Sequence, residues 1–179
     1  MVITSIAVFC GSKSGNNPLF AKQAQQLGYL LAEKNIILIY GGGNKGLMAS
    51  VANAVLERSG KVIGVIPKIL TEWEHQHENI TELIISEDMH SRKKLLYEKC
   101  DAAIILPGGV GTLDEFFEML TWNQLSIHNK KIFLLNTDGF YNALLEHIKK
   151  MKQEGFLYEK TDERISILSS VEELKNYLN

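Results

Sequence analysis

The sequence has little of what marks several specialised classes of protein. Only 2 cysteines occur in 179 residues, too few for a disulfide scaffold. Cys10 and Cys100 have neither CxxC nor metal-finger spacing, so we interpret them as reduced, partly buried thiols. No apolar run approaches the roughly 18 residues of a membrane-spanning helix, and no basic segment precedes an apolar one at the N-terminus. These absences predict a cytoplasmic protein with no membrane partner.

An excess of charge of one sign is also missing. Lys and Arg number 19 against 21 Asp and Glu, which gives a formal net charge of −2 and a pI near 6.2. The chain therefore has no broad cationic field for nucleic acid. His75, His77 and His90 lack the spacing of a metal site with a third ligand, and no GxSxG elbow occurs. We expect no nucleic-acid partner, no metal and no cofactor.

What is present indicates one domain over residues 1–179 with a substantial core, since 45% of the residues are hydrophobic. Continuous apolar, β-branched runs predict strands buried on both faces, at residues 5–10, 36–40, 62–66, 82–86, 102–106, 131–135 and 164–168. Helices are predicted between them, at residues 18–34, 46–58, 88–99, 112–125, 139–153 and 171–178. This alternation predicts an α/β fold, a Rossmann-like three-layer sandwich with a mainly parallel sheet of about seven strands. The long connection at 67–80 is a candidate lid or pocket wall.

Three glycine-rich turns follow predicted strands, where such folds bind ligands: the first at residues 10–18, the second at 40–48 and the third at 106–115. The second turn has GxGxxG spacing, but no acidic residue follows about 20 residues on, as an NAD site requires. Leu47 stands where a P-loop has its lysine. This turn is either a structural tight turn or a ligand contact. Its candidate site residues are Gly42 and Gly43, with Met89 from the helix at 88–99.

The third glycine turn is more specific. Gly108, Gly109 and Gly111 let backbone N–H groups approach an anion, and the helix that follows begins with unpaired donors and a positive dipole end. Such a turn suits one phosphate group. The alternative is a capping box, because Thr112-x-x-Glu115 ahead of an apolar run has that pattern, and Glu115 would then only bond its own helix.

The helical wheel of the same segment has apolar residues on both sides. One face carries Leu113, Phe116, Phe117 and Leu120, and the opposite side carries Glu115, Met119 and Trp122. A helix with two apolar faces is expected to be shielded from solvent on both of them. We expect the sheet as one cover and a ligand pocket, a second subunit, or both as the other.

The helix at 88–99 places an arginine where core is expected. Arg92 lies within the arc spanned by Met89, Leu95 and Leu96, and a buried guanidinium needs an anionic or acceptor partner. Arg92 forms an ion pair with Glu115 or another acid, or it points into a ligand site beside that acid. Lys93, one step further round, is interpreted as solvated surface.

The motif PGGVGTLDE resembles the PGGxGTxxE signature of the lonely guy (LOG) family of cytokinin-activating phosphoribohydrolases. The stretches CGSKSGNNP, YGGGNKGLM, VIGVIPK, MHSRK, TWNQLSIHNK and EGF occur in the family's order, so the resemblance covers nearly the whole chain. It implies hydrolysis of the N-glycosidic bond of a nucleoside 5′-monophosphate, AMP or an N6-modified derivative, to a free base and ribose 5-phosphate. Although members have carried the label "lysine decarboxylase", no lysine here has a pyridoxal-site context.

The resemblance also assigns roles to residues. It implies that Arg92 and Glu115 are catalytic and that the family forms homodimers. Substrate contacts are implied at Glu74, Lys93, Gly108, Gly109, Val110, Gly111, Thr112, Leu113, Asp114 and Thr121. The alternative function is a non-hydrolytic nucleotide or molybdenum-cofactor carrier on the same scaffold. Such a binder would not require both Arg92 and Glu115.

Overall fold

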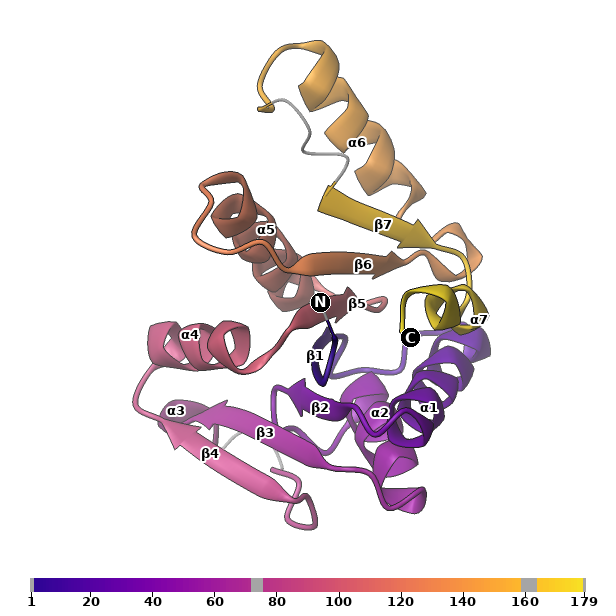
Figure 1. Cartoon of the computed structure of the whole chain (residues 1–179), viewed down its shortest axis with the longest axis vertical. Helices are drawn as coiled ribbons and strands as arrows, with labels where there is room; N and C mark the ends of the chain where they lie inside the picture. The colour runs from indigo at the N-terminus through magenta and orange to yellow at the C-terminus, as the bar shows by residue number, and fades with distance from the viewer. Residues whose placement is uncertain (1, 72–75, 159–163, 179) are drawn as a thin grey trace.

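The computed structural model describes residues 2–71, 76–158 and 164–178, and its centre is a parallel seven-stranded sheet (Figure 1). The strands are β1 Ser5–Phe9, β2 Ile37–Tyr40, β3 Val62–Pro67, β4 Glu82–Ser86, β5 Ala102–Ile105, β6 Lys131–Leu135 and β7 Ile165–Leu168. They pair in the order β4-β3-β2-β1-β5-β6-β7, and every pair is parallel. The direction of strand order reverses between β1 and β5. In open parallel sheets, ligands bind beyond the carboxyl ends of the strands at such a reversal.

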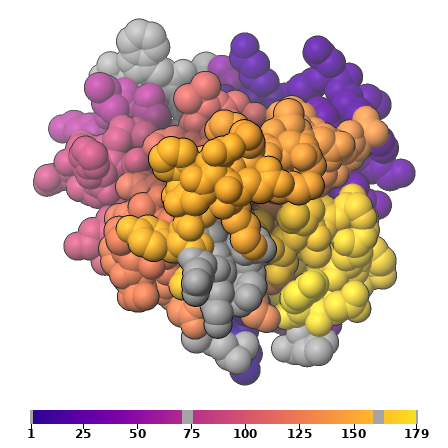
Figure 2. Space-filling view, turned by 90° about the horizontal axis from the view of Figure 1, so that it is seen from above, coloured from indigo at the N-terminus to yellow at the C-terminus, as the bar shows by residue number. Residues whose placement is uncertain are grey.

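Helices cover both faces of the sheet. They are α1 Pro18–Glu33, α2 Gly46–Glu57, α3 Lys68–Thr71, α4 Met89–Lys99, α5 Val110–Gln124, α6 Asn142–Gln153 and α7 Val171–Leu174, with 3₁₀ turns η1 Thr137–Gly139 and η3 Lys175–Tyr177. The core cluster on one face draws on α1, α2 and α7, and the cluster on the other face draws on α4, α5 and α6. Figure 2 shows α6, in light orange, covering the end of the molecule that is uppermost in Figure 1. None of the described helices is both long and apolar enough to cross a lipid bilayer.

Strand β1 shows why the apolar runs are continuous. All five of its residues are buried. Ile6 and Val8 join the cluster of α1 and α2, whereas Ala7 and Phe9 join the cluster of α4 and α5. Because successive side chains of a strand point to opposite faces, a sheet covered on both sides needs an apolar residue at every position.

Side-chain caps place two of the helix starts beside the carboxyl edge of the sheet. At α1 the side chain of Asn17 accepts a hydrogen bond from the N–H of Leu19, and Pro18 occupies the first turn. At α4 the side chain of Asp88 accepts a hydrogen bond from the N–H of Ser91 at 2.7 Å. The cap at Asp88 fixes the helix that carries Arg92.

The structure confirms the predicted α/β class and corrects several element bounds. Helix α5 begins two residues before the predicted 112. The connection at 67–80, predicted without helix, contains α3, and Gly43 and Gln76 form an isolated bridge. The predicted helix at 139–153 is divided into η1 and α6, and the one at 171–178 into α7 and η3. The sheet is wholly rather than mainly parallel.

Candidate functional site

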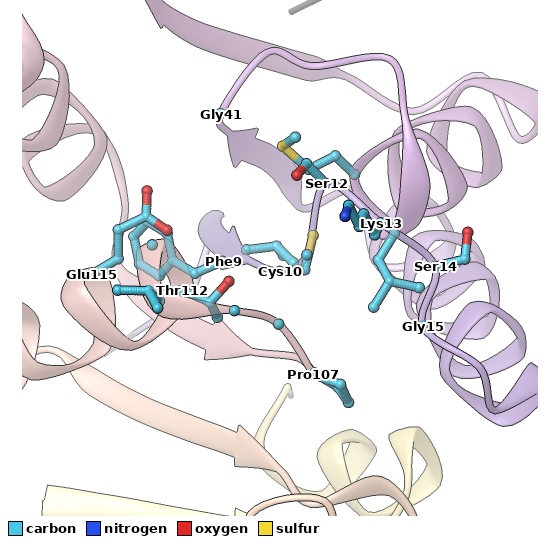
Figure 3. A pocket seen from close by; sticks show the side chains of 18 of the residues that line it. Phe9, Cys10, Ser12, Lys13, Ser14, Gly15, Gly41, Pro107, Thr112 and Glu115 are labelled. Atoms are coloured by element: carbon cyan, nitrogen blue, oxygen red, sulfur yellow. The ribbon is translucent and has the colours of Figure 1, made fainter.

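A cavity of about 530 Å³ opens at the carboxyl ends of the neighbouring strands β1 and β5, and all three glycine turns contribute to its wall. Figure 3 shows residues of the first turn on one side of this cavity, with Thr112 and Glu115 on the other. The charged residues among the described lining are Lys13, Arg92 and Glu115. Arg92 and Met89 of α4 therefore meet Glu115 and most of the predicted third-turn residues in one place.

Backbone contacts lock the glycine turns together. The N–H of Gly11 donates to the carbonyl of Pro107 at 3.0 Å, and the N–H of Leu47 donates to the carbonyl of Gly11 at 3.1 Å. Gly46 has a φ of +57°, and a Cβ there would lie 2.4 Å from the carbonyl carbon of Ser12. Gly46 is thus required by close packing and by its left-handed backbone. This locking fixes the cavity wall before any ligand binds.

The glycines of the third turn divide into two kinds. A Cβ on Gly108 would lie 2.1 Å from Oγ1 of Thr112 and 2.9 Å from the backbone nitrogen of Gly11, so packing requires glycine there. A Cβ on Gly109 or on Gly111 would meet nothing within 4 Å, although both residues line the cavity. Packing within the described part of the protein therefore does not explain why these two positions are glycine. A ligand that approaches the backbone closely would explain it, because a side chain at either position would occupy the space of the ligand.

The first turn of α5 lines this space. Gly109 is the N-cap residue and has no side chain to cap the helix, and no side chain of the described residues is seen to accept a hydrogen bond from the N–H groups of this turn. The first four N–H groups of a helix lack intrahelical acceptors. Since the helix begins at Val110, the donors available to an anion are those of residues 109–112, one residue later than the glycine pattern suggested.

The difference between Gly108 and Gly111 can be tested with a matched pair of alanine variants. Gly108→Ala is expected to lower the free energy of unfolding by about 1–3 kcal/mol, because the added methyl overlaps Thr112 and Gly11. Gly111→Ala is expected to keep or raise the melting temperature, since alanine favours a helix, yet to weaken binding of ribose 5-phosphate about tenfold. Thermal unfolding and titration calorimetry measure the two effects. If Gly111→Ala bound this phosphate as tightly as the wild type, the third turn would not be its binding site.

Arg92 and Glu115 form a buried ion pair at the cavity wall. Nη1 of Arg92 donates to Oε1 of Glu115 at 2.9 Å, and Nε donates to the carbonyl of Val65 at 3.1 Å. The predicted ion pair with Glu115 is confirmed, and Arg92 also lines the cavity beside that acid. That the cavity is a ligand site stays a prediction. The capping-box alternative is wrong, because α5 begins before Thr112 and the carboxylate of Glu115 turns to Arg92 instead of to its own helix.

Two features of its surroundings shift the pKa of Glu115 in opposite directions. Burial raises the pKa of this carboxyl above its ordinary value, while Arg92 acts to lower it. Burial is the larger effect. A carboxylate whose pKa is raised is a stronger base than a solvated glutamate, and perturbed pKa values of this kind are common at functional sites.

Gly41 makes room for the arginine, a role that the sequence alone did not indicate. A Cβ on Gly41 would lie 2.5 Å from Nη2 of Arg92 and 3.3 Å from Sδ of Met48. Gly42 and Gly43 do not line the cavity: Gly42 accepts a backbone hydrogen bond from His77, and Gly43 forms the bridge to Gln76. The structure thus gives structural contacts for Gly42 and Gly43, whereas Met89 lines the cavity as expected.

Other predicted contacts, at Lys93, Asp114 and Thr121, do not line the cavity. Lys93 is not simple solvated surface: only 13% of its side chain is exposed, and it pairs with Asp114 at 3.1 Å and Glu118 at 2.9 Å. Although burial opposes it, these hydrogen bonds raise the pKa of Lys93. Thr121 is exposed on α5.

The remaining predicted positions are less informative. Val110 lies on the rim of the cavity, 85% exposed, whereas Leu113 is half-buried in the core. Glu74 and His75 lie outside the described residues. Within the described ranges, no group of three or more His, Cys, Asp or Glu side chains is placed to hold a metal ion.

Several lining residues were missed by the sequence reasoning. The first glycine turn contributes Lys13 to the wall, and aromatic side chains at one end come from Phe20 and Phe140, whose ring centroids are 5.4 Å apart. Cys10 also lines the cavity, where burial raises the pKa of its thiol. The signal available for Lys13 was its place in a glycine turn that follows a buried strand.

Comparison with known proteins gives a consistent family assignment. A family model described as "Possible lysine decarboxylase" matches residues 48–178. A cytokinin riboside 5′-monophosphate phosphoribohydrolase of Rhodococcoides fascians is 43% identical over 94% of this chain and 85% of its own length. The Arabidopsis thaliana enzyme of the same name, LOG7, is 50% identical over 85% of this chain and 70% of its own.

Solved structures share the fold at lower identity. A molybdenum cofactor binding protein from Rippkaea orientalis has a TM-score of 0.72 at 25% identity, covering 100% of this chain and 99% of that one. A Moco carrier protein from Chlamydomonas reinhardtii has a TM-score of 0.72 at 19% identity, covering 97% and 94%. The sequence likeness to the hydrolases is thus much stronger than the likeness to these carriers.

Proposed function

Because the chain belongs to the LOG family of cytokinin riboside 5′-monophosphate phosphoribohydrolases, we propose that it hydrolyses the N-glycosidic bond of a nucleoside 5′-monophosphate. The substrate is AMP or an N6-modified derivative, and the products are an adenine-type base and ribose 5-phosphate. The observation that carries this proposal is the buried pair of Arg92 and Glu115, which shares one cavity with the unpacked glycines of the third turn.

The third glycine turn would hold the 5′-phosphate. Its N-cap glycine gives no side-chain cap to the N–H groups of the first turn, and a Cβ at Gly109 or Gly111 would extend into open space that a phosphate can use. The positive end of the α5 dipole adds to the attraction for an anion. A phosphate held there places the ribose next to Glu115, one turn further along the helix. Binding energy from the phosphate thereby orients the reacting carbon.

Glu115 would act on the anomeric carbon. When the bond between C1′ and the base nitrogen breaks, its electron pair leaves with the base and positive charge develops on the ribose. The carboxylate of Glu115 stabilises that charge and accepts a proton from the water that adds to C1′. The proton that Glu115 takes from water is then returned, directly or through solvent, to the departing base, so the products are the neutral base and ribose 5-phosphate and Glu115 is again a carboxylate.

Arg92 would hold the acid in position and contact the substrate. Its Nη1 and Nε atoms are bonded to Glu115 and Val65, while Nη2 lies against the bare backbone of Gly41. The apolar part of the wall near Gly41 includes Met48 and Met89. We assign the base to this apolar part, where flexible methionines adapt to a planar ring.

The raised pKa of Glu115 predicts the pH dependence of the reaction. The acting form is the carboxylate, so kcat/KM falls as the pH drops through the pKa of the free enzyme. Because burial raises that pKa, we expect the acid limb of the profile to lie above the ordinary range of a glutamate, which is about 4.3. Initial rates of adenine release from AMP between pH 4 and pH 9 measure it. An acid limb at or below the ordinary value would contradict the role given to Glu115.

A substrate panel tests the proposed function. The purified protein is incubated with adenosine, AMP, ADP, ATP and an N6-isopentenyl AMP, and the free base is measured by chromatography. We expect release from the monophosphates and little from adenosine, because only the monophosphates use the third turn. A carrier of the molybdenum-cofactor type would bind a nucleotide without releasing base, and that result would overturn the proposal.

We further propose that the protein is a cytoplasmic homodimer. Two exposed apolar residues lie at the C-terminal end of α5, Leu125 at the C-cap with 58% exposure and Ile127 beyond it with 60%, and contact with a second subunit would cover them. Light scattering after size exclusion gives the mass in solution. A mass near twice the 20.1 kDa of the chain is expected, and a monomer across the working concentrations would contradict it.

A further inference from the structure

We propose that Lys13 is a substrate-binding residue that neutralises the 5′-phosphate from the side of the cavity opposite the third glycine turn. This inference rests on the proposed function and adds to it a source of selectivity for phosphorylated substrates. Lys13 lines the cavity, and in Figure 3 it lies across from Thr112 and Glu115.

The backbone of Lys13 is held in place by its neighbours. A Cβ on Gly46 would lie 2.5 Å from the backbone nitrogen of Lys13, and a Cβ on Gly11 would lie 2.9 Å from its carbonyl oxygen. Gly11 is itself bonded to Pro107, at the start of the third glycine turn. The base of the Lys13 side chain is thus fixed relative to the donors of α5. Only the methylene stem has to become ordered when a phosphate binds.

The charges of the cavity wall show why this lysine matters. Among the described lining residues, the charge of Arg92 is compensated by Glu115 at 2.9 Å. Without Lys13 the described wall would therefore have no net charge, whereas a phosphate monoester carries nearly two negative charges at neutral pH. Lys13 supplies the remaining positive charge. Backbone N–H groups give hydrogen bonds, and the lysine adds a full charge to them.

Lys13 has a free ammonium group in the described part of the chain, where no ion pair or side-chain hydrogen bond engages it. The contrast is with Lys93, whose ammonium group is already bound by two carboxylates. A lysine that is exposed, unpaired within the described residues and on the wall of the cavity is available to an anionic ligand. Lys45, on the second glycine turn, is also exposed but does not line the cavity.

The test compares Lys13→Met with Lys45→Met, a matched loss of one positive charge from the neighbouring turn. For Lys13→Met we expect the KM for AMP to rise on the order of ten- to a hundredfold, because one hydrogen bond between charged groups is lost. We expect kcat to stay within about threefold of the wild-type value. Lys13→Arg restores most of the affinity. Hydrolysis of adenosine, which has no phosphate, is unchanged in all three variants. The melting temperatures are expected to match the wild type, because both lysines are exposed.

The outcomes separate this inference from the proposed function. If the wild type releases adenine from AMP and Lys13→Met has the same KM as Lys45→Met, the role of Lys13 is refuted and the hydrolase assignment stands. If the wild type releases no base, the proposed function fails, and calorimetric binding of ribose 5-phosphate decides the role of Lys13 instead. Weaker binding by Lys13→Met alone supports it, and equal binding by both variants overturns it.

Discussion

Glu115→Gln is expected to lower the turnover of AMP by on the order of 10² to 10⁴ while leaving the fold intact. Glutamine has nearly the same shape, so the cavity keeps its form, but the amide carries no charge to stabilise the ribosyl cation and accepts no proton from water. Arg92 keeps its bond to the carbonyl of Val65, which limits the cost of losing its partner. Turnover is measured by adenine release at saturating AMP, and the fold by circular dichroism.

Glu118→Gln is the control for this variant. Glu118 lies one turn further along α5, pairs with Lys93 at 2.9 Å and accepts a hydrogen bond from Tyr97, but it does not line the cavity. Like Glu115→Gln, Glu118→Gln breaks an ion pair between α4 and α5, but it leaves the cavity wall unchanged. It therefore measures the effect on turnover of losing such an ion pair alone. We expect turnover within about threefold of the wild type, because neither Glu118 nor Lys93 lines the cavity and Lys93 keeps its pair with Asp114. Equal losses in both variants would refute a chemical role for Glu115.

Arg92→Met has the second largest expected effect, and it acts on stability and on turnover together. Removing one partner of a buried pair leaves the other charge uncompensated, which costs on the order of 3 kcal/mol in unfolding free energy, the lower end of the range because the pair lines an open cavity. Turnover is expected to fall on the order of 10²- to 10³-fold, as for the loss of one preorganised donor. Chemical denaturation and steady-state rates give the two values.

The pH profile distinguishes this role of Arg92 from a purely structural one. Arg92 lowers the pKa of Glu115, so its removal raises that pKa further. The carboxylate form then exists only at higher pH, and the acid limb of the residual activity moves up. A more stable variant with an unchanged rate would show that Arg92 is only a tolerated buried charge.

Much of the fold could be predicted from the sequence. Each continuous apolar run became a strand whose ends differ from the prediction by at most one residue, because a doubly covered sheet demands apolar side chains at every position. The order of the strands could not be predicted in the same way. It depends on which strands pair across long stretches of chain, as β1 does with β5, and local patterns carry no information on that pairing.

The site was predicted less completely. The helical wheel indicated that Arg92 is buried, but its partner could be chosen only when α4 and α5 were seen side by side. The capping pattern at Thr112 was misleading because glycine at 109 caps the helix and the ion pair with Arg92 takes up the carboxylate of Glu115. The roles of Gly41 and Lys13 depend on atoms from other turns, so no spacing within one segment could indicate them.

The shared fold explains why carriers and hydrolases resemble each other. The molybdenum-cofactor proteins have the same sheet and helices at 19–25% identity, and the fold alone does not define the chemistry. In this chain the hydrolase proposal depends on side chains, above all on the carboxylate that faces the cavity.

A crystal structure of Glu115→Gln with AMP bound would show where the nucleotide binds, because the slow variant would keep the substrate intact. We expect the 5′-phosphate within hydrogen-bond distance of the N–H groups of residues 109–112, with C1′ facing the side chain at position 115. A phosphate bound elsewhere, with the third glycine turn empty, would contradict this expectation.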